Sequence, residues 1–243
     1  MSRMVWYAFL AMLFVGFVTT GFADGFFSKN ATLVMSDTAR NPANGDMTVS
    51  VRPLDEERES AFPALLRVEI GTRQFERWFD FGLNAQVLWS ADANRFAVTG
   101  SAQGANGRYK TAVVDLTPEG IRWTDVNGLV EKAFGHPVRC GWPELPNVVA
   151  VVWLSRVQLV LAAQIINHSN CDSYGTFVAY QVRLGRPRIE RTYGQLEAKK
   201  LWGSALGPDL ADARDGCITN PKSCYVPAHH PELAPLGVRR NDR

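Results

Sequence analysis

The stretch that decides the fold is Val87–Gly100, VLWSADANRFAVTG. Its two ends are rich in bulky apolar residues, and its middle, Ser90–Asn94, consists of small and polar residues that favour turns. Short apolar runs on either side of such a cluster are typical of a β-hairpin. We therefore predict two antiparallel strands, Gln86–Trp89 and Arg95–Thr99, joined by a tight turn.

Three further hairpins in the chain follow a common plan. In each, an alternating strand leads into a turn of about four residues, and the next strand opens with a bulky apolar residue. The three pairs of strands are Leu66–Ile70 with Phe75–Phe79, Thr111–Leu116 with Ile121–Val126, and Phe177–Leu184 with Ile189–Tyr193. The plan predicts antiparallel sheets, each with one buried face.

The hairpins belong to a longer repeat. Val151–Leu154 followed by Gln158–Ala162 matches the pattern around Val87, so that Trp89 and Trp153 are equivalent. Equivalent residues lie about 65 positions apart, and a near-constant offset indicates a repeated structural unit. Each unit is a predicted four-stranded sheet, and a first copy starts at about Ala31, with Met47–Arg52 as its second strand.

This repeat resembles a blade of the TolB-type periplasmic β-propellers. The residues that carry the resemblance are the Trp-Ser-x-Asp turn, Trp89–Asp92, and the strand that ends in Val-Val-Asp-Leu, Val113–Leu116. The match covers Val87–Val126 well and Val148–Tyr193 loosely, because the second copy lacks Ser-x-Asp after Trp153. Propellers have four to eight blades, and only three copies are found.

We therefore expect a mainly β fold of repeated antiparallel four-stranded sheets, propeller-like or a β-sandwich. An open three-bladed stack, a half-propeller completed by a homodimer and a simple sandwich all agree with three copies. Two short helices are expected within this domain, at Leu129–Phe134 and Gly194–Trp202.

The amino-terminal residues have the pattern of an export signal. Arg3 precedes an apolar run, Met4–Val18, and Gly21 and Ala23 place small residues at a cleavage site before Asp24. The alternative is an uncleaved membrane anchor, since the uncharged stretch is long enough for a membrane-spanning helix. We expect a signal peptide over 1–23, a β domain over 24–206, a Pro-rich carboxy-terminal strap over 207–243, and a periplasmic or secreted protein.

The four cysteines, Cys140, Cys171, Cys217 and Cys224, are expected to form two disulfides in an oxidising compartment. Three connectivities are possible. In the hairpin that turns near Ser155, the numbers of paired residues should sum to about 311. Cys140 and Cys171 satisfy the same sum, which favours Cys140–Cys171 and Cys217–Cys224.

We expect the protein to hold neither a metal nor another cofactor. A zinc site would need Cys217, Cys224 and the adjacent histidines, His229 and His230, whose spacing differs from that of zinc-binding motifs. The acidic residues near Asp212 lack the alternate spacing of a calcium loop.

Composition and motifs argue against several classes of function but do not identify one. The formal charge of +2 is nearly balanced, which gives no electrostatic reason to expect nucleic acid as a partner. The sequence contains no nucleophile elbow, zinc-protease motif or phosphate-binding loop. We expect a non-enzymatic binding or scaffold protein acting through protein contacts. The alternative is an exported hydrolase of glycans or peptides, with a histidine as base: His136, His168, His229 or His230.

Two features are candidates for partner binding. Arg186, Arg188 and Arg191 belong to the most basic stretch of the chain, which could form an acidic-partner patch or a solvated sheet edge. Trp142 lies in a loop next to Cys140 and could be a contact residue or a cover for a disulfide. A membrane is expected as a partner only if the signal remains uncleaved.

Overall fold

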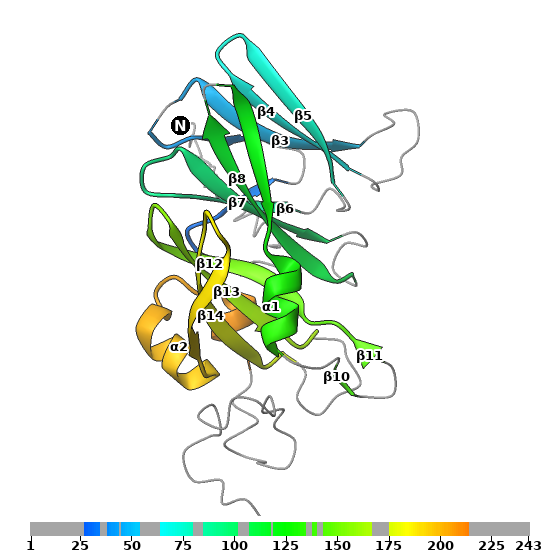
Figure 1. Ribbon diagram of the computed structural model, residues 1–243, viewed down its shortest axis with the longest axis vertical. Coiled ribbons are helices and arrows are strands. Elements are labelled where there is room, and N and C mark those ends of the chain that lie inside the picture. Colours follow the sequence, from blue (N-terminus) through cyan, green and yellow to red (C-terminus); the bar gives the residue numbers. More distant parts are fainter. Residues whose placement is uncertain are drawn as a thin grey trace, which may run out of the picture.

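The computed structural model describes residues 27–34, 38–43, 45–53, 64–79, 85–101, 107–117, 119–134, 138–139, 143–166 and 175–213. Within these ranges the protein is mainly β, with three antiparallel sheets of four or five strands and a few short helices. Figure 1 shows the sheets one above another in the order of the sequence. The expected fold class is confirmed.

The strands of each sheet follow one another along the chain, with one exception. The first sheet contains β2 Thr38–Arg40, β3 Met47–Pro53, β4 Ala64–Ile70 and β5 Arg73–Phe79. The second contains β1 Thr32–Val34, β6 Ala85–Trp89, β7 Arg95–Ser101, β8 Tyr109–Thr117 and β9 Gly120–Asp125. The third contains β12 Asn147–Ser155, β13 Gln158–Gln164, β14 Phe177–Arg183 and β15 Arg188–Tyr193. A separate two-stranded pair joins β10 Val138–Arg139 to β11 Pro143–Glu144.

The predicted hairpins are confirmed, and so is the equivalence of Trp89 and Trp153. Trp89 pairs with Phe96 in the second sheet, and Trp153 pairs with Leu159 in the third. Trp89 packs against the core between the first and second sheets, whereas Trp153 donates a hydrogen bond of 3.0 Å from Nε1 to the carbonyl of Leu88. Each tryptophan therefore faces the sheet that precedes its own.

Our placement of the first copy was wrong at its start. The segment after Ala31 forms β1, which pairs with β6 of the second sheet, with Thr32 opposite Val87. The first strand of the first sheet is instead β2, which pairs with β3. A three-residue strand such as β1 contains too few alternations to specify its partner, and its place depends on the burial of Val34 between two sheets.

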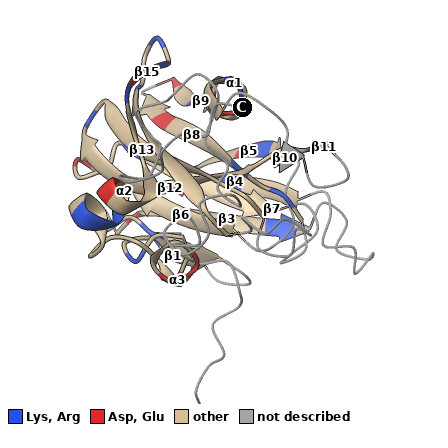
Figure 2. Ribbon diagram, turned by 90° about the horizontal axis from the view of Figure 1, so that it is seen from below, with Lys and Arg blue, Asp and Glu red and all other residues tan. Residues whose placement is uncertain are grey.

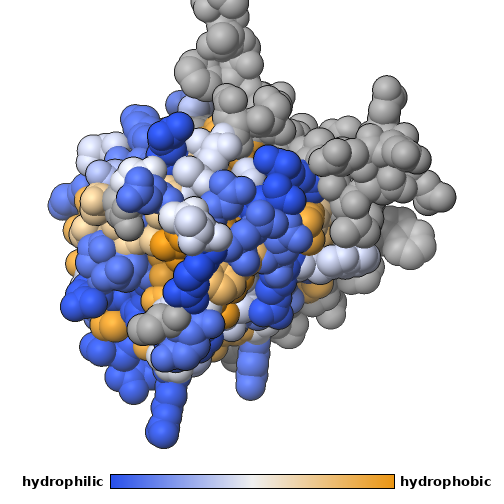
Figure 3. All heavy atoms as spheres, turned by 90° about the horizontal axis from the view of Figure 1, so that it is seen from above, coloured by the Kyte–Doolittle hydropathy of each residue, from blue (hydrophilic) through white to orange (hydrophobic). Residues whose placement is uncertain are grey.

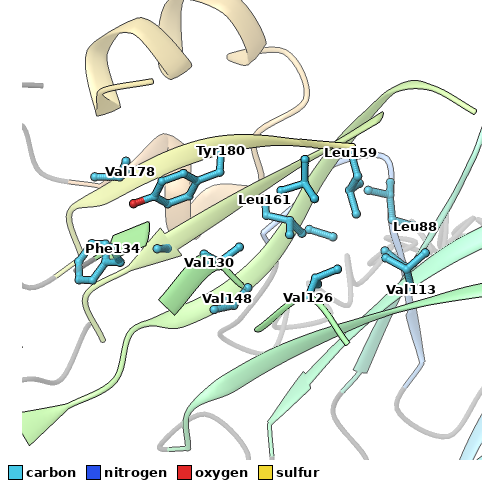
Figure 4. Packing of buried hydrophobic residues seen from close by; sticks show 14 of the residues in the cluster. Leu88, Val113, Val126, Val130, Phe134, Val148, Leu159, Leu161, Val178 and Tyr180 are labelled. Atoms are coloured by element: carbon cyan, nitrogen blue, oxygen red, sulfur yellow. The ribbon is translucent and has the colours of Figure 1, made fainter. Parts of the chain in front are cut away.

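Two apolar layers hold the three sheets together. Val49, Leu66 and Val68 of the first sheet pack against Val87 and Val98 of the second. Between the second and third sheets, a layer contains residues from both sheets and from helix α1, Asn127–Phe134. Figure 4 shows the helix residues Val130 and Phe134 within this layer, close to Val148 and Tyr180. The second sheet is therefore buried on both faces, as inner members of a stack must be.

The outer face of the third sheet is covered by chain segments. Helix α2, Gln195–Trp202, and helix α3, Pro208–Ala211, pack with Phe27 against its side chains. Helices α1 and α2 agree with the two predicted helices, and α3 was not predicted. Phe27–Lys29 joins this cover through backbone hydrogen bonds to Ala205 and Gly207.

The free edge of β12 is closed by side-chain hydroxyls rather than by another strand. The Thr111 Oγ1 donates to the carbonyl of Val148 at 2.8 Å, and Ser28 Oγ donates to that of Val151 at 2.7 Å. The backbone N–H of Ala150 donates to Thr99 Oγ1 at 3.2 Å. Unpaired backbone groups at a buried edge need such partners, so these hydroxyls fix the third sheet onto the second.

Candidate interaction surface

The structure places the predicted arginines together on the hairpin β14–β15. Arg186 lies in its turn, and Arg188 and Arg191 lie on β15. Trp142, the four cysteines and the four histidines lie outside the described residues, so the disulfide, metal and hydrolase hypotheses stay predictions. The register that favours Cys140–Cys171 is found in β12 and β13, where Asn147 pairs with Gln164 and Ala150 with Leu161.

We call Arg183, Arg186, Arg188 and Arg191 the basic ridge. The pairing Arg183↔Arg188 and Gln181↔Arg191 places three of these arginines on the outer face of the third sheet. Arg188 and Arg191 have 65% and 62% of their side chains exposed, and Arg186 is exposed in the turn. In Figure 2 the tip of this hairpin is blue, and helix α2 carries both blue and red segments. All four arginines belong to the basic stretch identified in the sequence, of which Arg186, Arg188 and Arg191 were the binding candidates.

Glu190 holds part of the ridge in place. Its carboxylate accepts hydrogen bonds from Arg183, from Arg188 at 3.3 Å and from Gln158 at 2.6 Å. The hydrogen bond from Arg183, followed by that from Gln158, lowers the pKa of Glu190 to about 2. Glu190 is therefore a carboxylate at neutral pH, and one negative charge is shared by two arginines.

Helix α2 continues the surface beyond Arg191. Arg191 forms an ion pair of 3.0 Å with Glu197 of α2 and lies over the ring of Tyr193, 4.7 Å from its centre. Tyr193 in turn meets Trp202 edge to face, with ring centres 4.7 Å apart. Leu196 and Leu201 are 46% and 53% exposed on the same helix. Leu201 lies four residues after Glu197, so an exposed apolar side chain shares a helix face with the partner of Arg191.

A second cluster of charges joins the sheets at their turns, and sequence reasoning missed its role. Arg156, in the β12–β13 turn, donates from Nε to Asp92 of the β6–β7 turn at 2.6 Å. Asn41, after β2, donates from Nδ2 to the carbonyl of Ala93 at 2.8 Å. We call these contacts the turn contacts, because they link corresponding turns of all three sheets.

The Trp-Ser-x-Asp turn itself explains why these contacts form. Ser90 Oγ donates to Asp92 Oδ1 at 2.7 Å, and Ala93 has a φ of +54°, a conformation rare outside glycine. Burial raises the pKa of Asp92, but the hydrogen bonds from Ser90, Asn94 and Arg156 together lower it by more, so the net shift is downward. The signal in the sequence was therefore the turn motif. Its polar side chains form hydrogen bonds that stabilise the fold.

The described residues contain no group of three or more His, Cys, Asp or Glu side chains that could hold a metal ion. Asp209 lies in the first turn of helix α3, and Asp212 follows that helix. No helix in the described part of the chain is long and apolar enough to cross a membrane.

No protein-family model matches this chain, and no curated protein matches its sequence significantly.

Proposed function

We propose that this is an exported, non-enzymatic binding or scaffold protein that contacts its protein partner through the basic ridge. The observation that carries the proposal is the gathering of exposed arginines around Glu190 on a hairpin that no other described sheet covers. A surface excess of one charge favours a partner of the opposite charge and raises the rate of encounter.

The hydrogen bonds of the buried polar side chains support a binding role over a catalytic one. Thr99 and Thr111 bond to each other and to β12, and Asn147 bonds to the backbone of Tyr109 and to Gln164. These bonds hold one sheet to the next. These buried hydrogen-bonding groups thus contribute to architecture, which supports a role for the surface in function.

The resemblance to TolB-type propeller blades and the export signal support the same proposal. Stacked sheets provide a rigid body on which exposed hairpins are held in fixed positions. Function on such a scaffold depends on the surface residues and not on the fold alone.

Site-specific photo-crosslinking in living cells tests the proposal. The photoreactive residue p-benzoylphenylalanine would replace Arg186 in one variant and Thr72 in a control. Both positions are exposed in hairpin turns, but Thr72 belongs to the β4–β5 hairpin of the first sheet. We expect discrete adducts of higher mass from position 186 and none from position 72.

Adducts of equal yield at the two positions, or none at position 186, would overturn the proposal. So would hydrolysis of a glycan or peptide by the purified mature protein.

A further inference from the structure

The basic ridge and helix α2 form one continuous surface with two kinds of chemistry. Arg191 lies at the junction, because it pairs with Glu197 of α2 and stacks over Tyr193, which packs against Trp202. Leu201 lies four residues after Glu197, so both side chains are on neighbouring turns of one helix face. The surface therefore runs from exposed arginines to an exposed leucine.

The arginines keep most of their hydrogen-bonding capacity for a partner. A guanidinium has five N–H donors in a planar arrangement that suits carboxylates. Arg188 uses one nitrogen on Glu190, and Arg191 uses one on Glu197. Arg186 forms no hydrogen bond or ion pair in the structure as described. These three arginines can therefore donate hydrogen bonds to additional carboxylates without losing their present contacts.

The exposed edge of β15 is poorly suited to pairing with another strand. A bulge interrupts its register with β14 between Gln181 and Val182, and half of its residues are charged. Both features oppose the addition of a strand. A partner is expected to bind this surface through side chains.

We propose that the partner binds with an acidic, amphipathic peptide segment. Its carboxylates would pair with Arg186, Arg188 and Arg191, and a large apolar residue would pack against Leu201 and Trp202. The proposal rests on the proposed function and specifies its partner: a protein segment with acidic residues beside an apolar one. Charge complementarity determines which segments approach, and the apolar contact determines how they are aligned.

Selection from a library of random dodecapeptides displayed on phage tests this inference with the purified mature protein. We expect enrichment of sequences in which Asp or Glu residues flank Leu, Phe or Trp. The affinity of a selected peptide should fall by about tenfold or more in the double variant Arg188→Glu/Arg191→Glu, and should decrease as salt rises. Leu201→Ser should weaken binding several-fold without changing its salt dependence.

The matched control is the double variant Arg40→Glu/Arg52→Glu. It changes the net charge by the same amount on the first sheet, where both arginines are exposed, and should leave the affinity unchanged. Thermal unfolding of every variant verifies that the fold is retained. Enrichment of peptides without acidic residues, an equal loss in the control, or no enrichment would each overturn the inference. Adducts from position 186 in cells would still support the proposed function in any of these cases.

Discussion

The two outer faces of the stack end the repeat in different ways. On the first sheet, the outward side chains of β3–β5 are mostly polar, and Arg67 pairs with Glu76 across neighbouring strands at 2.7 Å. On the third sheet, outward residues such as Val160 and Ala179 are buried beneath α2, α3 and Phe27. Figure 3, which views the molecule from above, shows rows of hydrophilic residues with hydrophobic ones between them.

This difference shows how three sheets can form a stack that ends in water. Terminal units of a repeat must present a polar outer face or be covered, because an apolar face left open would attract other chains. The first sheet has a polar face, and the third is covered by α2, α3 and the segment before β1. Residues outside the repeat are therefore as necessary to the fold as the repeated strands.

The largest expected effect on the free energy of unfolding distinguishes the covered outer face of the third sheet from the open outer face of the first. Phe27 is 1% exposed and meets Tyr109 edge to face, with ring centres 4.8 Å apart. Phe27→Ala should lower the free energy of unfolding by about 3–5 kcal/mol, because it leaves a cavity beneath the cover. Trp78→Ala on the open face, where the side chain is 61% exposed, should change it by about 0.5 kcal/mol or less. Urea unfolding measures both, and similar losses would contradict the comparison.

The hydroxyls at the edge of β12 should have the next largest effect. Thr111→Val keeps the shape of the side chain but removes its hydrogen bonds to Val148 and Thr99. We expect a loss of about 1–3 kcal/mol, the cost of leaving a buried polar group without a partner. Thr48→Val is the control, because Thr48 bonds to Glu69 on the open face of the first sheet. An equally large loss of unfolding free energy in the control would show that the destabilisation by Thr111→Val does not come from the buried hydrogen bonds at the β12 edge.

The turn contacts should contribute less than either buried feature. Arg156 is 74% exposed although it pairs with Asp92, and exposed ion pairs contribute up to about 1 kcal/mol. Arg156→Ala should lower the unfolding free energy by that amount at most. It should also raise the pKa of Asp92, because one of the hydrogen bonds that lower this pKa is removed. Chemical denaturation and carboxyl NMR titration provide the two measurements, and a loss above 3 kcal/mol would place the main link between the sheets at the turns.

The smallest expected effect is the pH dependence at the basic ridge. Glu190 has a pKa of about 2 in the folded protein against an ordinary 4.5, so its contribution to stability is complete above about pH 4.5 and is lost as the pH falls toward 2. Arg183→Gln should move the pKa of Glu190 back toward 4.5. Carbon-detected NMR titration of the carboxyl group follows this change, and an unaltered pKa would assign the shift to other neighbours.

The hairpins could be predicted because their information is local. Alternation along β4 and β14 and turn formers such as Gly71 and Gly185, both with positive φ, define strands and turns without any distant residue. The ridge could be predicted in the same way, since its arginines are close together in the chain. The Cα pairing of Asn147 with Gln164 likewise follows from a tight turn.

Other features depend on distant contacts and could not be predicted. Nothing in Thr32–Val34 specifies β6 as its partner, and the partner of Arg156 lies in another sheet. The pairing of Arg191 with Glu197, on the helix that carries Leu201, depends on how α2 packs on the third sheet. Such contacts join segments far apart in the sequence, and residue patterns within each segment do not encode them.

The sequence by itself determined the β class, the repeat, the four-stranded units and the basic hairpin, because strand periodicity and turn residues act over a few neighbouring positions. Only the tertiary structure decided that the sheets stack in order, that hydroxyls from the second sheet close the edge of the third, and that Arg191 pairs with the helix that carries Leu201. Those outcomes depend on which apolar surfaces bury one another and which buried polar groups find partners. Both are properties of the assembled chain.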